Sequence, residues 1–205
     1  MFVHMTESPT RVEAFSDGVF AIAITLLILE IRVPHGDHDL WAGLLALWPS
    51  YIAFVMSFAV ILIMWINHHE LLRLVRGVNY PFLFANGLLL LTVTFVPYPT
   101  AVLAQNLATP DAKVAVAFYC ATFVAQALCW NLVFATIVRG GLLRQEVTAE
   151  SVSNVRRAYY VGVLVYAAAT ALAFVRPVLG LLLNISLWVV WIRLGYRAES
   201  SAVRR

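Results

Sequence analysis

Charged residues are scarce in this sequence: Asp, Glu, Lys and Arg make up 12% of its 205 residues, whereas 62% are hydrophobic. Ordinary soluble domains contain about 25% charged and roughly 45–50% apolar residues. This imbalance excludes a typical water-soluble domain. It favours a chain whose helices are surrounded by lipid rather than by water.

Cysteine is also rare, and the two that are present, Cys120 and Cys129, lie nine residues apart in one predicted helix. At about 100° per residue, they point to opposite sides of the helix axis. They therefore cannot form a disulfide with each other. We interpret both as apolar packing residues.

Motifs for catalysis and metal binding are lacking as well. No serine nucleophile elbow, phosphate-binding loop or nucleophile–base pair is visible. His68 and His69 are adjacent rather than four residues apart, so they fit interfacial hydrogen bonding better than a helical metal site. Residues 35–39 contain His and Asp without a further ligand, and we interpret them as a solvated connection. We expect no enzyme, no metal site and no cofactor.

Long runs without a charged residue take the place of these features. Six runs cover two-thirds of the chain: residues 18–29, 40–69, 77–110, 114–138, 158–175 and 177–192. A membrane-crossing helix needs about 20 mostly apolar residues, and these runs do not alternate as barrel strands do. We predict an all-α integral membrane protein with six transmembrane helices, approximately over residues 12–33, 44–68, 79–104, 113–138, 157–175 and 177–196.

The remaining residues are too few for a separate soluble domain, so we predict a single six-helix transmembrane domain over residues 1–205. The first hydrophobic run follows Arg11, Glu13 and Asp17 and has no convincing small-residue cleavage site. We therefore expect no cleavable signal peptide.

Positive charges are segregated between alternate ends of these six spans. Eleven of the 14 Lys and Arg residues lie on one side, and only Arg32, Lys113 and Arg176 lie on the other. Cytoplasmic loops carry the excess of Lys and Arg, so we predict that both termini are cytoplasmic. Because the basic residues are explained by topology, we expect no nucleic-acid partner.

The first predicted span, residues 12–33, contains the shortest uncharged run. Asp17 and Glu30 lie about 20 Å apart along it, at or inside the edges of a hydrocarbon core about 30 Å thick. Ionisable residues at such depth usually face protein or a water-filled path, so we expect this helix to be central. A Thr-x-x-Glu capping box over residues 10–13 predicts that it begins near Arg11.

One face of this helix carries small, apolar and hydroxyl side chains. At about 100° per residue, the following residues share this face: Gly18, Ile22, Thr25, Leu26 and Leu29. A packing or lipid-facing surface would have the same composition, so these residues alone leave that alternative open.

Asp17 points away from this face, about 140° from Ile22. Glu13, four residues earlier, repels it. We therefore expect the partner of Asp17 on another helix, with the best candidates over residues 65–73. A dipole-stabilising or capping role for Asp17 is the alternative.

Residues 11–30 read RVEAFSDGVFAIAITLLILE. They resemble the RxxxFSD signature and first helix of the transmembrane protein 175 family, the endolysosomal potassium channels of animals and their shorter prokaryotic relatives. Residues 65–69, at the end of the second predicted helix, support the resemblance. One copy of the signature resembles the prokaryotic form, which assembles four chains, whereas the animal form has two repeats per chain.

The resemblance implies a potassium-permeable leak channel, a homotetramer whose first helices line a central pore. No Thr-Val-Gly-Tyr-Gly filter is present in this sequence, as expected for that family. Carried onto this chain, Ile22, Leu26 and Leu29 form the apolar constriction, and Thr25 supplies a hydroxyl. The implied structural network comprises Arg11, Phe15, Ser16, Asp17, Trp65, His68 and His69.

The expected permeant ions are potassium and other monovalent cations, with moderate selectivity for potassium over sodium. The expected location is the prokaryotic cell membrane, which the chain crosses several times. An alternative function is a proton-coupled secondary transporter that uses Asp17, Glu30 and the two adjacent histidines.

Overall fold

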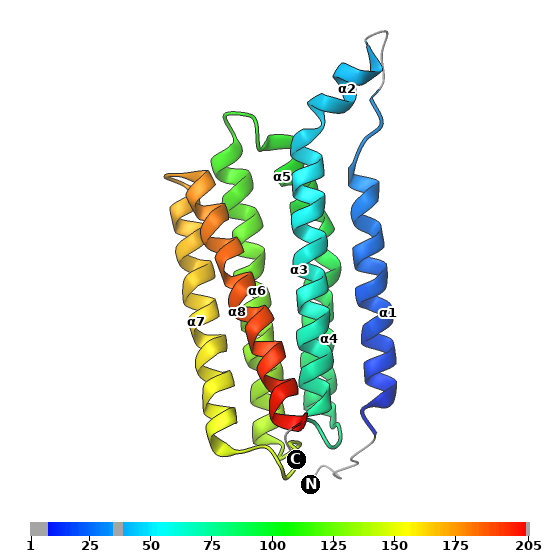
Figure 1. Cartoon of the computed structure of the whole chain (residues 1–205), viewed down its shortest axis with the longest axis vertical. Coiled ribbons are helices and arrows are strands. Elements are labelled where there is room, and N and C mark those ends of the chain that lie inside the picture. Colours follow the sequence, from blue (N-terminus) through cyan, green and yellow to red (C-terminus); the bar gives the residue numbers. More distant parts are fainter. Residues whose placement is uncertain (1–7, 35–38, 204–205) are drawn as a thin grey trace.

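A computed structural model describes residues 8–34 and 39–203, which form a bundle of long helices (Figure 1). Residues 35–38 of the predicted solvated connection, and the last two arginines of the C-terminal tail, lie outside the described residues. The helices are α1 (Thr10–Leu26), the 3-10 helix η1 (Leu27–Glu30), α2 (Leu40–Ala46), α3 (Trp48–Arg73), α4 (Tyr80–Phe95), α5 (Pro97–Asn106), α6 (Ala112–Arg139), α7 (Ala149–Ala173) and α8 (Pro177–Val203).

Within residues 8–34 and 39–203, four helical segments are long and apolar enough to cross a membrane: Thr10–Glu30, Trp48–Arg73, Tyr80–Asn106 and Ala112–Arg139. A shorter apolar helical segment covers Pro177–Arg193. The first half of α7 contains Glu150, Arg156 and Arg157, which lower its mean hydropathy. Six membrane crossings therefore stay a prediction.

The third long segment consists of two helices that meet end to end. Pro97 has no backbone N–H to donate to Val93, so the α-helical hydrogen-bond ladder is interrupted there. The Val96 N–H instead bonds the Val93 oxygen at 3.1 Å, and α5 begins at Pro97. The predicted span 79–104 is thus divided between α4 and α5.

The first helix differs from expectation at both ends. Its N-cap is Pro9, without a side-chain capping bond, and the Glu13 N–H bonds the Pro9 oxygen. The predicted capping box is therefore wrong. At the other end the α-helix tightens to a 3-10 turn over Leu27–Glu30, and Ile31 is extended, so the helix ends before the predicted residue 33.

Within one chain, α1 lies at the edge of the bundle and packs against α3 and α4 (Figure 1). The helix α6 packs against α4, α7 and α8, deeper in the bundle. A central position for α1 therefore requires several chains. The start of α1 and the end of α8 lie at the same end of the bundle (Figure 1).

The α3–α4 and α6–α7 connections pair at the end of the bundle where α1 begins (Figure 1). Val75 and Leu143 form an isolated antiparallel bridge. The Arg76 guanidinium donates to the Gly141 carbonyl at 2.8 and 3.2 Å. Gly141 has φ +60°, a left-handed conformation that glycine adopts without steric cost. These contacts hold the ends of α3 and α6 together.

Candidate pore face and its supporting network

The helix α1 has two faces of opposite character. The sequence-predicted constriction residues are exposed in the single chain, with exposed fractions of 59% for Ile22, 42% for Leu26 and 72% for Leu29. The opposite face is buried against α3 and α4 through Ser16, Phe20 and Ala23. It continues at Leu27 of η1, which is buried where η1 packs against α3 and α5. Large apolar side chains thus form a continuous surface that the rest of the described chain does not cover.

Thr25 lies on the exposed face beside Ile22. Its hydroxyl donates a hydrogen bond to the Ile22 carbonyl at 2.9 Å. The hydroxyl proton is therefore directed into the helix, and the oxygen lone pairs remain on the exposed side. Each chain thus presents one hydroxyl oxygen among the apolar side chains of this face.

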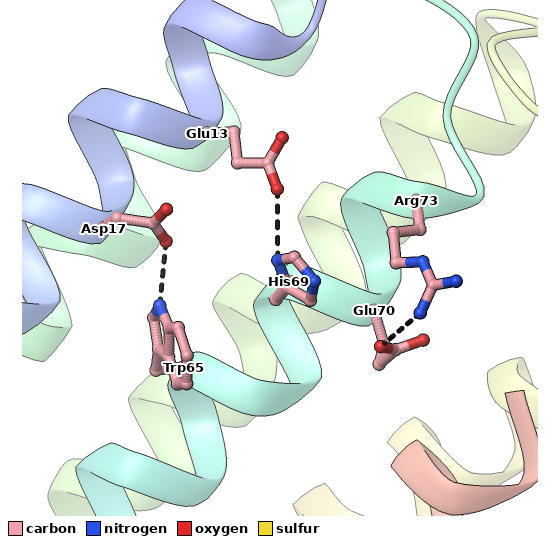
Figure 2. A network of polar contacts seen from close by, with 6 residues as sticks. All are labelled: Glu13, Asp17, Trp65, His69, Glu70 and Arg73. Carbon is pink, nitrogen blue, oxygen red and sulfur yellow. Dashed lines mark hydrogen bonds and ion pairs between the residues drawn. The ribbon is translucent and has the colours of Figure 1, made fainter. Parts of the chain in front are cut away.

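Two polar contacts join α1 to the end of α3 (Figure 2). The Trp65 indole N–H donates to Asp17 Oδ1 at 2.8 Å. One turn further, His69 Nδ1 lies 3.1 Å from Glu13 Oε1, a contact that becomes an ion pair when the imidazole is protonated. The expectation that Asp17 finds a partner among residues 65–73 is confirmed by its bond to Trp65.

A buried hydrogen-bonded chain links three helices behind these contacts. Asn86 of α4 donates from Nδ2 to Ser16 Oγ of α1 at 3.1 Å. The Asn86 Oδ1 lies 2.8 Å from His68 Nε2 of α3. Because an amide oxygen can only accept, His68 Nε2 carries the proton. Ser16, His68 and Asn86 are all almost completely buried.

Aromatic rings surround the two histidines. His68 lies between Phe20 and Trp130, with ring centroids 5.4 and 6.2 Å away. His69 stacks on Trp65 at 6.1 Å. These rings restrict the imidazoles to the orientations in which they reach α1 and α4. The network is therefore held by packing as well as by hydrogen bonds.

Two residues of the expected network lie elsewhere. Arg11 and Phe15 are on the exposed side of α1, and Phe15 is 67% exposed. They share the face of Ile22 rather than that of Ser16 and Asp17. A contact for either residue inside the network is therefore absent from the described part of one chain.

Asn86 was missed by sequence reasoning. It is a polar residue within the long uncharged run 77–110, and polar side chains inside a membrane usually bond across helices. That signal points to Asn86 as a network residue. It does not identify Ser16 and His68 as its partners, because the rotation of α4 against α1 and α3 decides which side chains meet.

The site offers no metal-binding cluster. In the described parts of the chain, no group of three or more His, Cys, Asp or Glu side chains is placed to hold a metal ion. The polar groups behind α1 are bonded mainly to each other. These hydrogen bonds fix the rotation of α1 about its axis. The apolar face of α1, which carries the Thr25 hydroxyl, therefore points away from the bundle.

The sequence matches the model of the family described as endosomal/lysosomal potassium channel TMEM175 over residues 11–97. A potassium channel of Chamaesiphon minutus is 47% identical over 183 residues, which cover 83% of this chain and 89% of the relative. A potassium channel of Streptomyces collinus is 47% identical over 169 residues, covering 80% and 82%.

The fold is similar to a solved crystal structure of a lysosomal potassium-selective channel TMEM175 homolog from Chamaesiphon minutus. The TM-score is 0.77 at 42% sequence identity, and the match covers 92% of this chain and 97% of the other. With the matched signature region and relatives that align over most of their length, the chain belongs to the TMEM175 family of potassium channels.

Proposed function

We propose that this protein is a potassium-permeable leak channel of the cell membrane, built from four identical chains with one α1 from each lining a central pore. The exposed apolar face of α1, which lies opposite its bonded face, is the observation that carries the proposal. A single chain leaves this face uncovered at the edge of the bundle. Symmetric assembly would turn four such faces toward one axis.

In this proposal each chain is one six-helix membrane domain with both termini in the cytoplasm. The common end of α1 and α8 supports an even number of crossings (Figure 1). The distribution of Lys and Arg supports the orientation, since eleven of the 14 lie on the side assigned to the cytoplasm.

The constriction is formed by rings of Ile22, Leu26 and Leu29. An apolar ring has no oxygen with which to replace the water around an ion. An ion therefore passes partly hydrated or after losing part of its shell. Potassium holds its water less tightly than sodium, so this barrier favours potassium, and the preference is moderate because no ligand cage fits one cation. Other monovalent cations pass more slowly.

Thr25 adds a ring of hydroxyl oxygens between the apolar rings. Because its proton is bonded to the Ile22 carbonyl, the lone pairs face the pore and attract a partly dehydrated cation. A slight narrowing of the neighbouring apolar rings would dewet this segment and stop conduction without moving a charge. No steep voltage dependence is expected, because the later helices lack a regular ladder of arginines.

The polar network sets the position of this face. Asp17 and Ser16 tie α1 to α3 and α4, so the network controls how far the Ile22 ring lies from the pore axis. Arg11 and Phe15, which are exposed in one chain, are placed to contact a neighbouring chain. The network residues therefore support assembly and the open state rather than contact the ion.

Ion flux through the purified protein in lipid vesicles tests the function. Under potassium and sodium gradients the channel conducts both ions, potassium faster, and bilayer recordings resolve unitary currents. The transporter alternative, which uses Asp17 and Glu30, predicts saturable uptake driven by a pH gradient and no unitary currents. Chemical crosslinking in the same vesicles gives a ladder that ends at four chains if the tetramer is correct.

A further inference from the structure

A cavity lies inside each chain, away from α1. Its walls come from α3, α6, α7 and α8, and its volume is about 40 Å³. A water molecule needs roughly 10–15 Å³ measured in this way, so the cavity admits a few waters or one very small organic molecule. Its lining contains no residue of the pore face and no hydrogen-bonded residue of the Asp17 network, although Trp130 also packs against His68.

Of the two side-chain amides that line this cavity, Asn67 already donates to the Ile63 carbonyl at 2.8 Å, and the buried one is Gln126. Its side chain is only 3% exposed, and neither its Oε1 nor its Nε2 has a hydrogen-bond partner among the described residues. A buried amide without partners is costly. The Gln126 amide presents one acceptor oxygen and two donor protons in one plane, an arrangement that can bind a hydroxyl or amide group.

The remaining walls are mostly aromatic and aliphatic. Trp130, Tyr159 and Trp191 line the cavity together with the flexible Met64. The Trp191 indole N–H is already bonded to the Tyr166 hydroxyl at 2.9 Å. Aromatic walls provide contact area for an apolar body, and Met64 can change rotamer to admit one.

The walls of the cavity carry no charged side chain. None of the lining residues is Asp, Glu, Lys, Arg or His, so a buried ion there would lack a counter-charge and would be strongly disfavoured. This distinguishes the cavity from the ion path proposed along α1. The two sites differ in the chemistry they accept.

We propose that this cavity is a binding site for a small neutral molecule with one hydroxyl or amide head and a short apolar body, the head bonded to Gln126. Two features are required together: an unpartnered buried amide, and an aromatic cavity around it. The site lies within one chain, so it does not depend on the proposed tetramer or on ion conduction.

2-Bromoethanol is a suitable probe because it is small enough for this cavity, its hydroxyl fits Gln126 and its bromine atom quenches tryptophan fluorescence on contact. It is titrated into the purified full-length protein in detergent, where Trp130 and Trp191 report from the cavity wall. We expect a saturable quenching component above the linear quenching by probe dissolved in the detergent. Ethanol, which carries no bromine and is small enough for the cavity, should compete for the saturable component.

Three variants test whether the saturable quenching component arises from binding in the cavity. Gln126→Leu removes the amide and should weaken binding roughly three- to tenfold, the loss of about one hydrogen bond. Ala127→Leu fills the cavity that Ala127 lines and should abolish the saturable component. Gln105→Leu, at an exposed position of α5, is the matched control and should leave it unchanged.

Purely linear quenching of the unmodified protein would overturn the proposal. So would a saturable component that is equally strong in folded Ala127→Leu. If both cavity variants fail to fold, the unmodified protein decides alone: saturable quenching that ethanol reverses supports the site, and quenching that ethanol leaves unchanged contradicts it.

Discussion

The helices α1 and α7 both expose large apolar side chains, yet they are held in the bundle in different ways. On α7, Leu164 is 69% exposed, while the buried side is held by aromatic packing and neutral hydrogen bonds: the Trp191 indole donates to the Tyr166 hydroxyl at 2.9 Å, and Asn131 donates to the Tyr159 carbonyl at 3.2 Å. On α1, Ile22 is 59% exposed, while the buried side is bonded to α3 and α4 through Asp17 and Ser16.

This difference teaches that exposure alone does not identify a pore face. On α7, neutral hydrogen bonds and aromatic packing hold the helix against α6 and α8. A face that surrounds an ion path must keep its rotation within a narrow range, and the bonds that fix α1 include a carboxylate, Asp17, and the buried chain of Ser16, Asn86 and His68. The carboxylate and the buried polar chain therefore distinguish α1 more clearly than its exposed apolar side does.

The largest effect on stability is expected from Asn86→Ala. The change leaves His68 Nε2 and Ser16 Oγ buried without their common partner, at a cost of about 1–3 kcal/mol. Thermal unfolding of the purified protein measures it. Asn106→Ala is the control, since Asn106 bonds only a carbonyl of its own helix, the Val102 oxygen. An equal loss of stability in the two variants would contradict the role of Asn86.

A smaller effect is expected from Asp17→Ala. It removes the acceptor of the Trp65 N–H, and a hydrogen bond to a charged group is worth about 1.5–3 kcal/mol, less when half-exposed. The fraction of tetramer and the open time should fall more than the potassium preference changes. Asp17→Asn keeps an acceptor and should be intermediate.

Glu70→Ala is the control for Asp17, because Glu70 pairs with Arg73 on its own helix at 3.0 Å (Figure 2). It should leave assembly unchanged. Normal assembly and normal currents in Asp17→Ala would refute the idea that α1 is positioned by directional bonds. Chromatographic size and bilayer currents provide the two readouts.

The smallest effect is expected from Thr25→Val, which keeps the shape of the side chain and removes its oxygen. Potassium flux and the potassium-over-sodium preference should each fall about two- to threefold, since one weak oxygen ring is lost from a mainly apolar path. Vesicle flux measures both. A loss of all selectivity would show that the hydroxyl ring, rather than the apolar rings, carries the preference.

Much of the site could be predicted from sequence because it lies on one helix. The angular positions of Ile22 and Asp17 follow from helix geometry, and the structure exposes the first and bonds the second to another helix. The role of Ile22 as a constriction stays a prediction. The apolar runs also located the long helices, because membrane helices need a minimum length.

Features that depend on three-dimensional contacts were beyond reach. The capping box failed because the Glu13 carboxylate contacts His69 of α3 instead of its own helix start. The 3-10 turn over Leu27–Glu30 has no clear local signal. Arg11 and Phe15 follow the exposed face of α1, so their proposed contacts require a neighbouring chain.

The central claim is that the exposed face of α1 lines the ion path, and paired substitutions on α1 and α7 test it most directly. Potassium and sodium flux is measured in vesicles for Ile22→Asn and for Leu164→Asn. In Ile22→Asn, potassium flux should rise on the order of tenfold, which corresponds to a permeation barrier lowered by about 1.4 kcal/mol. The preference for potassium over sodium should weaken. Leu164→Asn should match the unmodified protein. Unchanged flux and selectivity in Ile22→Asn would contradict the account.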